Sequence, residues 1–261
     1  RMASCADRLL AGAAAAGACR LDELALLYTV EVTAQAVGLT ESRVPAMARR
    51  LVSFFNQPPL DVTRPDLGRT RRQWAQAGVN ALLPIARFYL ADVRPAIRAR
   101  RRHRRADIIS HLLDEGYTNA DILVECVTYG TAGMVTTREF VSMACWHLLT
   151  NRPLLDRYLV GEQPERFAIL NEVIRLEPVV GHLYRRAHAP VELTDGGQAW
   201  TVPAGDLIDV CVRQANADPE AVGEQPLDLC PGRPLPRAVN AGALSFGDGA
   251  HRCPGQPLAL L

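Results

Sequence analysis

The chain has 261 residues, 48% of them hydrophobic, with 29 basic and 28 acidic side chains and a formal net charge of +1. It contains no lysine, so all 29 basic side chains are arginines. Chemistry that needs a lysine amine, such as Schiff-base formation or a phosphate-loop lysine, is therefore excluded. This length can bury a sizeable core, and the balanced charge suggests neither wholesale disorder nor a polybasic nucleic-acid coat.

Seven cysteines and six histidines are scattered along the chain. No cysteines are spaced C-x-x-C and no histidines are spaced H-x-x-x-H or H-E-x-x-H, so neither a zinc site nor a disulfide framework is expected. No apolar stretch approaches the roughly 18 residues that span a bilayer, and the first residues lack a signal-peptide layout. We therefore expect a cytoplasmic protein that does not interact with membranes.

Helical periodicity dominates the first two thirds of the chain. The pattern predicts helices at about 2–16, 21–37, 43–56, 69–103, 106–114, 119–150 and 163–176, with kinks near Pro84 and Pro95 and a short helix after Pro153. Between Cys126 and Thr137 the helix is apolar almost all round, which predicts a position at the centre of a core.

From Pro178 onward the character of the sequence changes. Short strands are predicted at 191–193, 200–202 and 207–210, separated by glycine-containing turns, and the last fifty residues are irregular and rich in proline and glycine. We predict one mainly helical domain over residues 1–261. Its helical part covers about 1–177, and a part with a small β element and a long coil covers about 178–261.

Residues 98–105, Arg-Ala-Arg-Arg-Arg-His-Arg-Arg, are the only local extreme of charge. A nucleic-acid site would need interleaved aromatic residues and a supporting motif, and both are missing. We interpret the run as a solvated helix end, where cations are favoured, and expect no nucleic-acid binding.

The most specific motif is Ser-Phe-Gly-Asp-Gly-Ala-His-Arg-Cys-Pro-Gly at 245–255. Glycines at 247, 249 and 255 let the backbone pass close to a flat ligand, and the thiolate of Cys253 can be a metal ligand. The alternative is an ordinary glycine-rich turn with a buried cysteine. The segment resembles the haem-binding loop of the cytochromes P450, F-x-x-G-x-H/R-x-C-x-G, at every fixed position.

This resemblance implies the cytochrome P450 fold and haem b (iron protoporphyrin IX) with Cys253 as its metal ligand. Phe246, Gly247, Gly249 and Gly255 would lie along the haem, and His251 would bind a propionate. The pair Glu172-x-x-Arg175 resembles the family's E-x-x-R, in which side chains on one helix face form a structural ion pair.

A third segment, Ala132-Gly133-Met134-Val135-Thr136-Thr137, is similar to the A-G-x-D/E-T-T signature of the P450 central helix. The resemblance implies that Gly133 leaves room for dioxygen and that Thr136 takes the oxygen-activation position. Threonines simply packed in a core helix are the alternative. Val135 stands where the family has an acid and cannot relay protons, so another group such as Glu139 would have to do so.

Further resemblances lie in the last third of the chain. Tyr-Arg-Arg-Ala at 184–187 is similar to the R-x-A strand, which implies that Arg185 binds a haem propionate; a surface ion pair is the alternative. Val180, Gly181 and His182 would face the substrate, with His182 as a polar anchor. Asn-Ala-Asp-Pro at 216–219 resembles the start of the coil before the haem loop, where Arg233 would be a structural arginine.

The resemblance as a whole implies a bacterial, soluble haem-thiolate monooxygenase of secondary metabolism. It would insert one oxygen atom from O2 into a small hydrophobic substrate, with electrons from a ferredoxin-type donor and its NAD(P)H reductase. Val135 motivates an alternative, a peroxide-driven or inactive accessory haem protein, and an arginine-rich binding protein without haem is a third. The family's N-terminal sheet, B–C region and C-terminal hairpin are not found, so we expect a fragment.

Overall fold

The structure is a computed structural model that describes residues 2–64 and 66–261. Contacts divide the chain into two compact units, the first ending at Ser142 and the second beginning at Met143. Within the described ranges, no helix combines the length and the apolar character that a membrane crossing requires.

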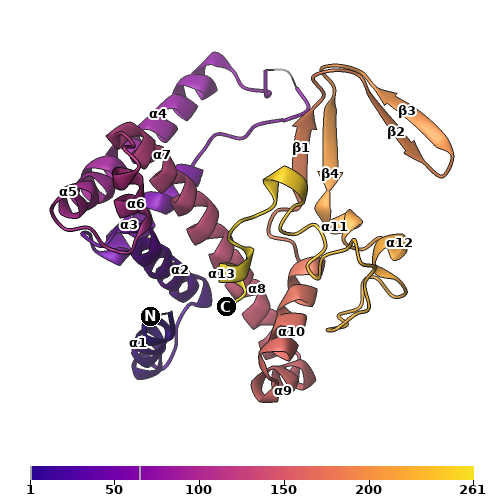
Figure 1. The fold of residues 1–261 in the computed structure, drawn as a ribbon, viewed down its shortest axis with the longest axis horizontal. Helices are drawn as coiled ribbons and strands as arrows, with labels where there is room; N and C mark the ends of the chain where they lie inside the picture. Colours follow the sequence, from indigo (N-terminus) through magenta and orange to yellow (C-terminus); the bar gives the residue numbers. More distant parts are fainter. Residues whose placement is uncertain (1, 65) are drawn as a thin grey trace. The chain divides into compact units, whose positions relative to one another are not determined.

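The first unit is built from helices (Figure 1). They are α1 (Met2–Ala16), α2 (Leu21–Val37), α3 (Val44–Val52), α4 (Arg71–Phe88), α5 (Arg94–Arg102), α6 (Ile108–Asp114), α7 (Asn119–Tyr129) and the first residues of α8 (Thr136–Thr150). The helix predicted at 69–103 is interrupted by the π-turn η2 (Tyr89–Val93), with Pro84 inside α4 and Pro95 in the first turn of α5. The helix predicted at 119–150 is interrupted by a second π-turn, η3 (Gly130–Val135).

Local sequence signals explain where several of these helices begin and end. Thr70 and Thr118 form capping boxes with Gln73 and Asp121, in which side chain and backbone satisfy one another's hydrogen bonds. Gly38 ends α2 with φ 102°, a left-handed conformation that a side chain rarely adopts.

The core of the first unit lies where α2, α3, α5, α6 and α7 meet. Its most buried apolar residues include Val30, Leu39, Met47, Leu51, Phe88, Ile97, Ile109, Ile122 and Met134. The buried hydroxyl of Thr29 donates to the carbonyl of Met134 at 2.8 Å, which joins α2 to η3.

Arg100 corrects our interpretation of the arginine run as a wholly solvated helix end. Its side chain is buried, with ion pairs to Asp107 at 2.5 Å and Glu41 at 3.2 Å and a hydrogen bond to Thr40 at 2.9 Å. A guanidinium can be buried when carboxylates and hydroxyls surround it in this way. The other arginines of the run are exposed.

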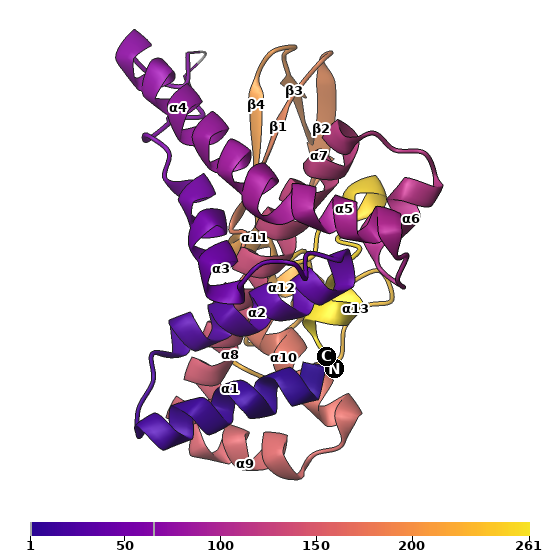
Figure 2. The same cartoon turned by 90° about the vertical axis from the view of Figure 1, so that its left-hand side faces the viewer.

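The second unit contains helices and two small sheets (Figure 2). Its elements after α8 are α9 (Arg152–Val160), α10 (Gln163–Leu176), β1 (His182–Arg186), β2 (Val191–Asp195), β3 (Gln198–Val202), β4 (Leu207–Cys211), α11 (Val212–Ala215), α12 (Pro219–Val222), the 3-10 turn η4 (Gly249–His251) and α13 (Gln256–Ala259). The described residues 223–248 form a coil without helix or strand.

Both sheets are antiparallel pairs, β1 with β4 and β2 with β3. The β2–β3 hairpin turns at Gly196 and Gly197, whose φ values of 54° and 80° suit a two-residue hairpin turn. β1 pairs with β4 so that His182 lies opposite Cys211 and Arg186 opposite Leu207. In the sequence, the β2–β3 hairpin therefore lies between the two strands of this pair.

Candidate functional site

In the first unit, the Ala-Gly-Met-Val-Thr-Thr segment lies where the π-turn η3 passes into α8. The hydroxyl of Thr136 donates to the carbonyl of Ala132, four residues earlier, and Thr137 is half-buried. A Cβ placed on Gly133 would stand 3.5 Å from Cγ2 of Thr33, an ordinary contact. Single π-turns inside helices are frequent at functional sites, and a back-bonded hydroxyl has a defined orientation.

The prediction that this helix is buried on every side is wrong. Between Cys126 and Thr137, the buried positions are Cys126, Gly130 and Met134, one in every four residues, whereas Ala132 is exposed. The reason is that α2 and α3 cover a single i, i+4 face, and a Cβ on Gly130 would lie only 2.8 Å from Leu51. Burial also raises the pKa of the Cys126 thiol to about 12, so this cysteine is a packing residue.

The acidic neighbour suggested for proton relay, Glu139, is exposed and accepts a hydrogen bond from Arg138. Val135, at the position where a carboxylate was expected from the family, is half-buried. The Val135 side chain has no proton to donate, so the adjacent polar side chain is that of Thr136.

In the second unit, Glu172 and Arg175 form a buried ion pair on α10, with two bonds of 2.7 and 2.8 Å. Arg233, from the coil, adds a third bond to the same carboxylate at 3.2 Å, and the N–H of Cys230 adds a fourth at 3.0 Å. Burial by itself raises the pKa of Glu172, but the hydrogen bonds from Arg175 and Cys230 outweigh it and hold the pKa below its usual value.

The guanidinium groups of Arg175 and Arg233 also donate hydrogen bonds to backbone carbonyls of the coil and of the segment before it. Arg175 donates to the carbonyls of Asn216 at 2.7 Å, Pro226 at 2.8 Å and Asp228 at 3.3 Å. Arg233 donates to carbonyls between residues 222 and 228. Most buried backbone groups in proteins are paired, and here arginine side chains pair them.

Asn216 connects α10 to the segment that leads into the cysteine loop. Its fully buried amide donates to the carbonyl of Arg175 at 3.0 Å and to the hydroxyl of Ser245 at 2.9 Å, and it accepts from the N–H of Leu244 at 2.8 Å. Ser245 donates in turn to the carbonyl of Ile174 at 2.7 Å. Sequence reasoning noticed the Asn-Ala-Asp-Pro segment but missed this role, because its partners lie 28 and 41 residues away.

The cysteine loop is closed by a backbone hydrogen bond of 2.8 Å from the N–H of Cys253 to the carbonyl of Phe246. Gly247 and Gly249 have φ values of 67° and 62°, which favour glycine. A Cβ on Gly255 would stand 3.7 Å from the sulfur of Cys253. The loop therefore holds the cysteine by a backbone contact, with a glycine beside its sulfur.

Cys253 itself is a free, exposed cysteine, and His251 beside it is exposed on η4. Arg185 is exposed on β1 and donates to the carbonyl of Tyr184 at 2.8 Å. Among the residues that the structure describes, no carboxylate pairs with Arg185, so the alternative of a surface ion pair is not what we observe. Val180 is exposed, Gly181 half-buried, and Nδ1 of His182 contacts Asp209.

The donor set of the second unit fits a haem held by a thiolate. A single exposed thiol lies in a loop whose glycines carry no Cβ. Arg185 and His251 are polar groups able to bind carboxylates such as propionates.

Comparisons with known proteins agree with this assignment. Residues 167–261 match the family model named Cytochrome P450. The chain is 33% identical over 141 residues to Cytochrome P450 144 of Mycobacterium tuberculosis, which covers 53% of this chain and 30% of the relative. It is 30% identical over 232 residues to cyclooctat-9-en-7-ol 5-monooxygenase of Streptomyces melanosporofaciens, which covers 74% of this chain and 49% of the relative.

Among solved structures, CalO2 is similar with a TM-score of 0.78 and 26% sequence identity, over 99% of this chain and 61% of that one. The chain thus spans less than half of the length of both curated relatives. The mainly helical fold is the cytochrome P450 fold, as the sequence predicted. The sequence match over residues 167–261 and the fold therefore both relate this chain to the cytochromes P450.

Proposed function

We propose that the whole protein is a haem-thiolate monooxygenase that inserts one oxygen atom from O2 into a small hydrophobic substrate. The observation that carries the proposal is the loop of Cys253, in which backbone hydrogen bonds and glycines present one exposed thiol. The name of the Streptomyces relative, a monooxygenase, agrees with this reaction type.

In this proposal, residues of the second unit hold the cofactor. Cys253 would bind the iron of haem b through its thiolate, and Phe246, Gly247, Gly249 and Gly255 would lie beside the ring. Arg185 and His251 would bind its propionates. When bound, haem b would supply the activation of dioxygen.

Residues of the first unit then manage protons. Gly133 and Ala132 leave space on the helix, and the hydroxyl of Thr136, oriented by its bond to the carbonyl of Ala132, holds the proton at Oγ1. Thr137 supports the same turn. Val135 supplies no proton, so the relay from solvent starts at another group.

Residues of the second unit also support a proposal for the substrate and the partner. Val180, Gly181 and His182 would face the substrate, which agrees with an apolar molecule that has one polar group. A ferredoxin-type donor and its NAD(P)H reductase would supply electrons, and Arg252, exposed beside the thiol, is a docking candidate for an acidic partner.

The reaction is tested by incubating the haem-loaded protein with a ferredoxin, its reductase, NADPH and a panel of apolar compounds under ¹⁸O2. We expect a product that carries one ¹⁸O atom. A product formed only when hydrogen peroxide replaces the electron donors would favour the peroxide-driven alternative. The absence of bound haem after reconstitution would contradict both.

We expect Thr136→Ala to lower the amount of product per NADPH consumed by about tenfold or more, because a positioned proton donor contributes about 10²–10⁴-fold to a rate. NADPH would still be consumed, so the ratio of product to NADPH is the measurement. Thr131→Ala is a matched control, since the Thr131 hydroxyl bonds to the carbonyl of Val127 in the same way. An unchanged ratio in Thr136→Ala would contradict the role.

We expect Pro254→Ala to raise the reduction potential of the haem-loaded protein. Proline has no N–H, and the alanine N–H could donate to the sulfur and withdraw charge. A hydrogen bond of about 0.5–1.5 kcal/mol corresponds to about 20–60 mV for one electron. Redox titration measures this, with Pro257→Ala as the control, and an unmoved potential in Pro254→Ala would exclude the idea.

A further inference from the structure

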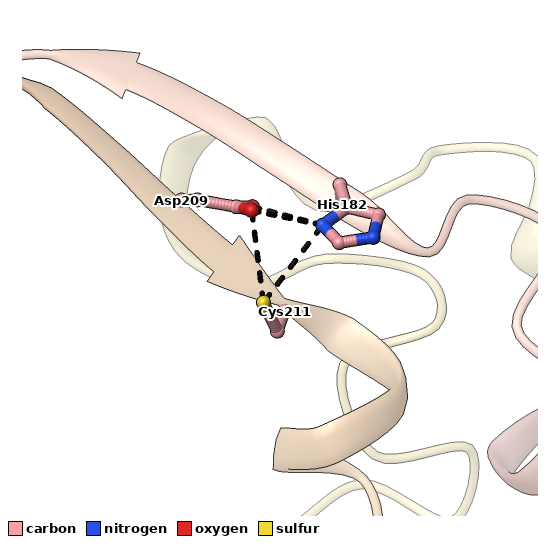
Figure 3. A group of neighbouring side chains, drawn as sticks. All are labelled: His182, Asp209 and Cys211. Carbon is pink, nitrogen blue, oxygen red and sulfur yellow. Dashed lines mark hydrogen bonds and ion pairs between the residues drawn. The ribbon is translucent and has the colours of Figure 1, made fainter. Parts of the chain in front are cut away.

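Three side chains of different chemistry meet on one face of the β1–β4 sheet (Figure 3). They are His182 of β1 and Asp209 and Cys211 of β4. The imidazole Nδ1, one carboxylate oxygen and the thiol sulfur all lie within 4.8 Å of one another. None of the haem-site roles proposed above uses Asp209 or Cys211.

The register of the antiparallel strands brings these three side chains together. His182 lies directly opposite Cys211 in the antiparallel pair, so their side chains leave the sheet on the same face. Asp209 is two residues before Cys211 and therefore points to that face as well. The end of the pair is held by a hydrogen bond of 2.9 Å from the N–H of Val212 to the carbonyl of Gly181.

A neighbouring ring restrains the histidine. The ring of Tyr184 stacks on the imidazole of His182, with ring centroids 5.9 Å apart and an interplanar angle of 6°. Nδ1 of His182 thereby faces the carboxylate, with distances of 2.9 and 3.1 Å to its oxygens. The imidazole is thus oriented before any ligand binds, which reduces the entropy lost on binding.

The separations of the donor atoms match one face of a metal tetrahedron. Bonds of about 2.3 Å to sulfur and 2.0–2.2 Å to nitrogen and oxygen put neighbouring ligand atoms about 3.3–3.6 Å apart in tetrahedral zinc sites. In the structure, sulfur lies 3.8 Å from Nδ1 and 3.6 Å from the carboxylate, and Nδ1 lies 2.9 Å from the carboxylate. Shifts of a few tenths of an ångström would complete the geometry.

We propose that His182, Asp209 and Cys211 form a binding site for a divalent cation of the zinc class, with water as the fourth ligand. One nitrogen, one oxygen and one sulfur suit Zn²⁺ or Co²⁺, whereas Mg²⁺ and Ca²⁺ require oxygen ligands. The His182 side chain is 53% exposed and that of Asp209 35%, so the ion exchanges with solution.

This site departs from the expectation that the chain has no zinc site, which rests on the absence of closely spaced ligand pairs. Here the antiparallel register brings His182 close to Asp209 and Cys211, which follow it by 27 and 29 residues. Asp209 and Cys211, the i and i+2 pair on a strand, are the only local signal.

The test uses the 261-residue chain freed of metal and titrated with Co²⁺. We expect a thiolate-to-cobalt absorption band that saturates at one ion per chain and disappears when Zn²⁺ is added. Cys211→Ser should remove the band, and His182→Ala and Asp209→Asn should each weaken Co²⁺ binding by at least about tenfold. Cys253→Ser and Cys230→Ser, which replace two other exposed cysteines, should leave it unchanged.

A measurement on the unmodified chain guards against variants that fail to fold. Zn²⁺ should slow alkylation of Cys211 by at least about tenfold, as followed by mass spectrometry, without slowing alkylation of Cys230. A missing cobalt band, a band retained in Cys211→Ser, or equal alkylation rates with and without Zn²⁺ would overturn the proposal. Because Cys253→Ser removes the proposed haem ligand and spares this site, failure of one proposal is distinguishable from failure of the other.

Discussion

Cys253→Ser is expected to abolish the thiolate-type shift of the reduced carbon monoxide absorption band in the haem-reconstituted protein. A serine hydroxyl does not ionise near neutral pH and cannot push electron density to the iron as a thiolate does. The loop should keep its shape, because the bond from residue 253 to Phe246 joins backbone atoms. The loss should therefore be complete and local.

The matched control is Cys230→Ser, since Cys230 is also a free, exposed cysteine of the second unit. The reduced carbon monoxide absorption band of the Cys230→Ser variant should equal that of the unmodified protein. If Cys253→Ser kept the shifted band, the thiolate would come from another cysteine, and the assignment of the loop would be wrong. A colourless unmodified protein after reconstitution would instead favour a binding protein without haem.

Glu172→Ala is expected to lower the free energy of unfolding of the second unit by about 3–5 kcal/mol, because it leaves the buried guanidinium of Arg175 without its carboxylate. Arg233 and the N–H of Cys230 lose the same acceptor. Urea unfolding followed by circular dichroism measures the change.

Glu165→Ala is the matched control on the same helix. Its ion pair with Arg157 is exposed, and exposed pairs contribute about 0–1 kcal/mol. Equal losses of stability in the two variants would contradict the view that the buried pair holds the unit together.

The pH dependence of stability follows from the direction of the Glu172 shift. Its pKa in the folded protein is held below the usual value. The stabilisation is therefore fully present above the unfolded pKa of about 4.3 and is lost as pH falls through the folded pKa. Glu172→Gln should weaken this dependence on pH.

The sequence predicted well the parts of the fold that depend on local signals. The helix ends predicted at about 37 and 119 are close to those observed, where Gly38 ends α2 and Thr118 caps α7. Periodicity did not reveal the π-turn η3, because one extra residue in a turn changes the apolar pattern very little. The ion pair of Arg100 with Glu41 was missed for a different reason, since Glu41 lies 59 residues away.

The candidate site likewise has parts that local sequence signals predict and parts that they do not predict. Cys253 and its glycines are contiguous and could be recognised as a motif, whereas the contacts of Asn216 and the meeting of His182 with Cys211 depend on tertiary pairing. Their partners come together only when a strand register or a coil path is defined, and no local pattern encodes these. The roles of Thr136 and Arg185 stay predictions for the experiments above.

The coil that Arg175 and Arg233 hold has a consequence for the order of folding. The bonds from Glu172 and Arg175 to this coil join residues 41 to 61 positions apart. Loops of this length must close before such contacts form, and they depend on an α10 that already presents both charges on one face. We infer that the coil acquires its path late, after α10, so the cysteine loop is assembled among the last steps of folding.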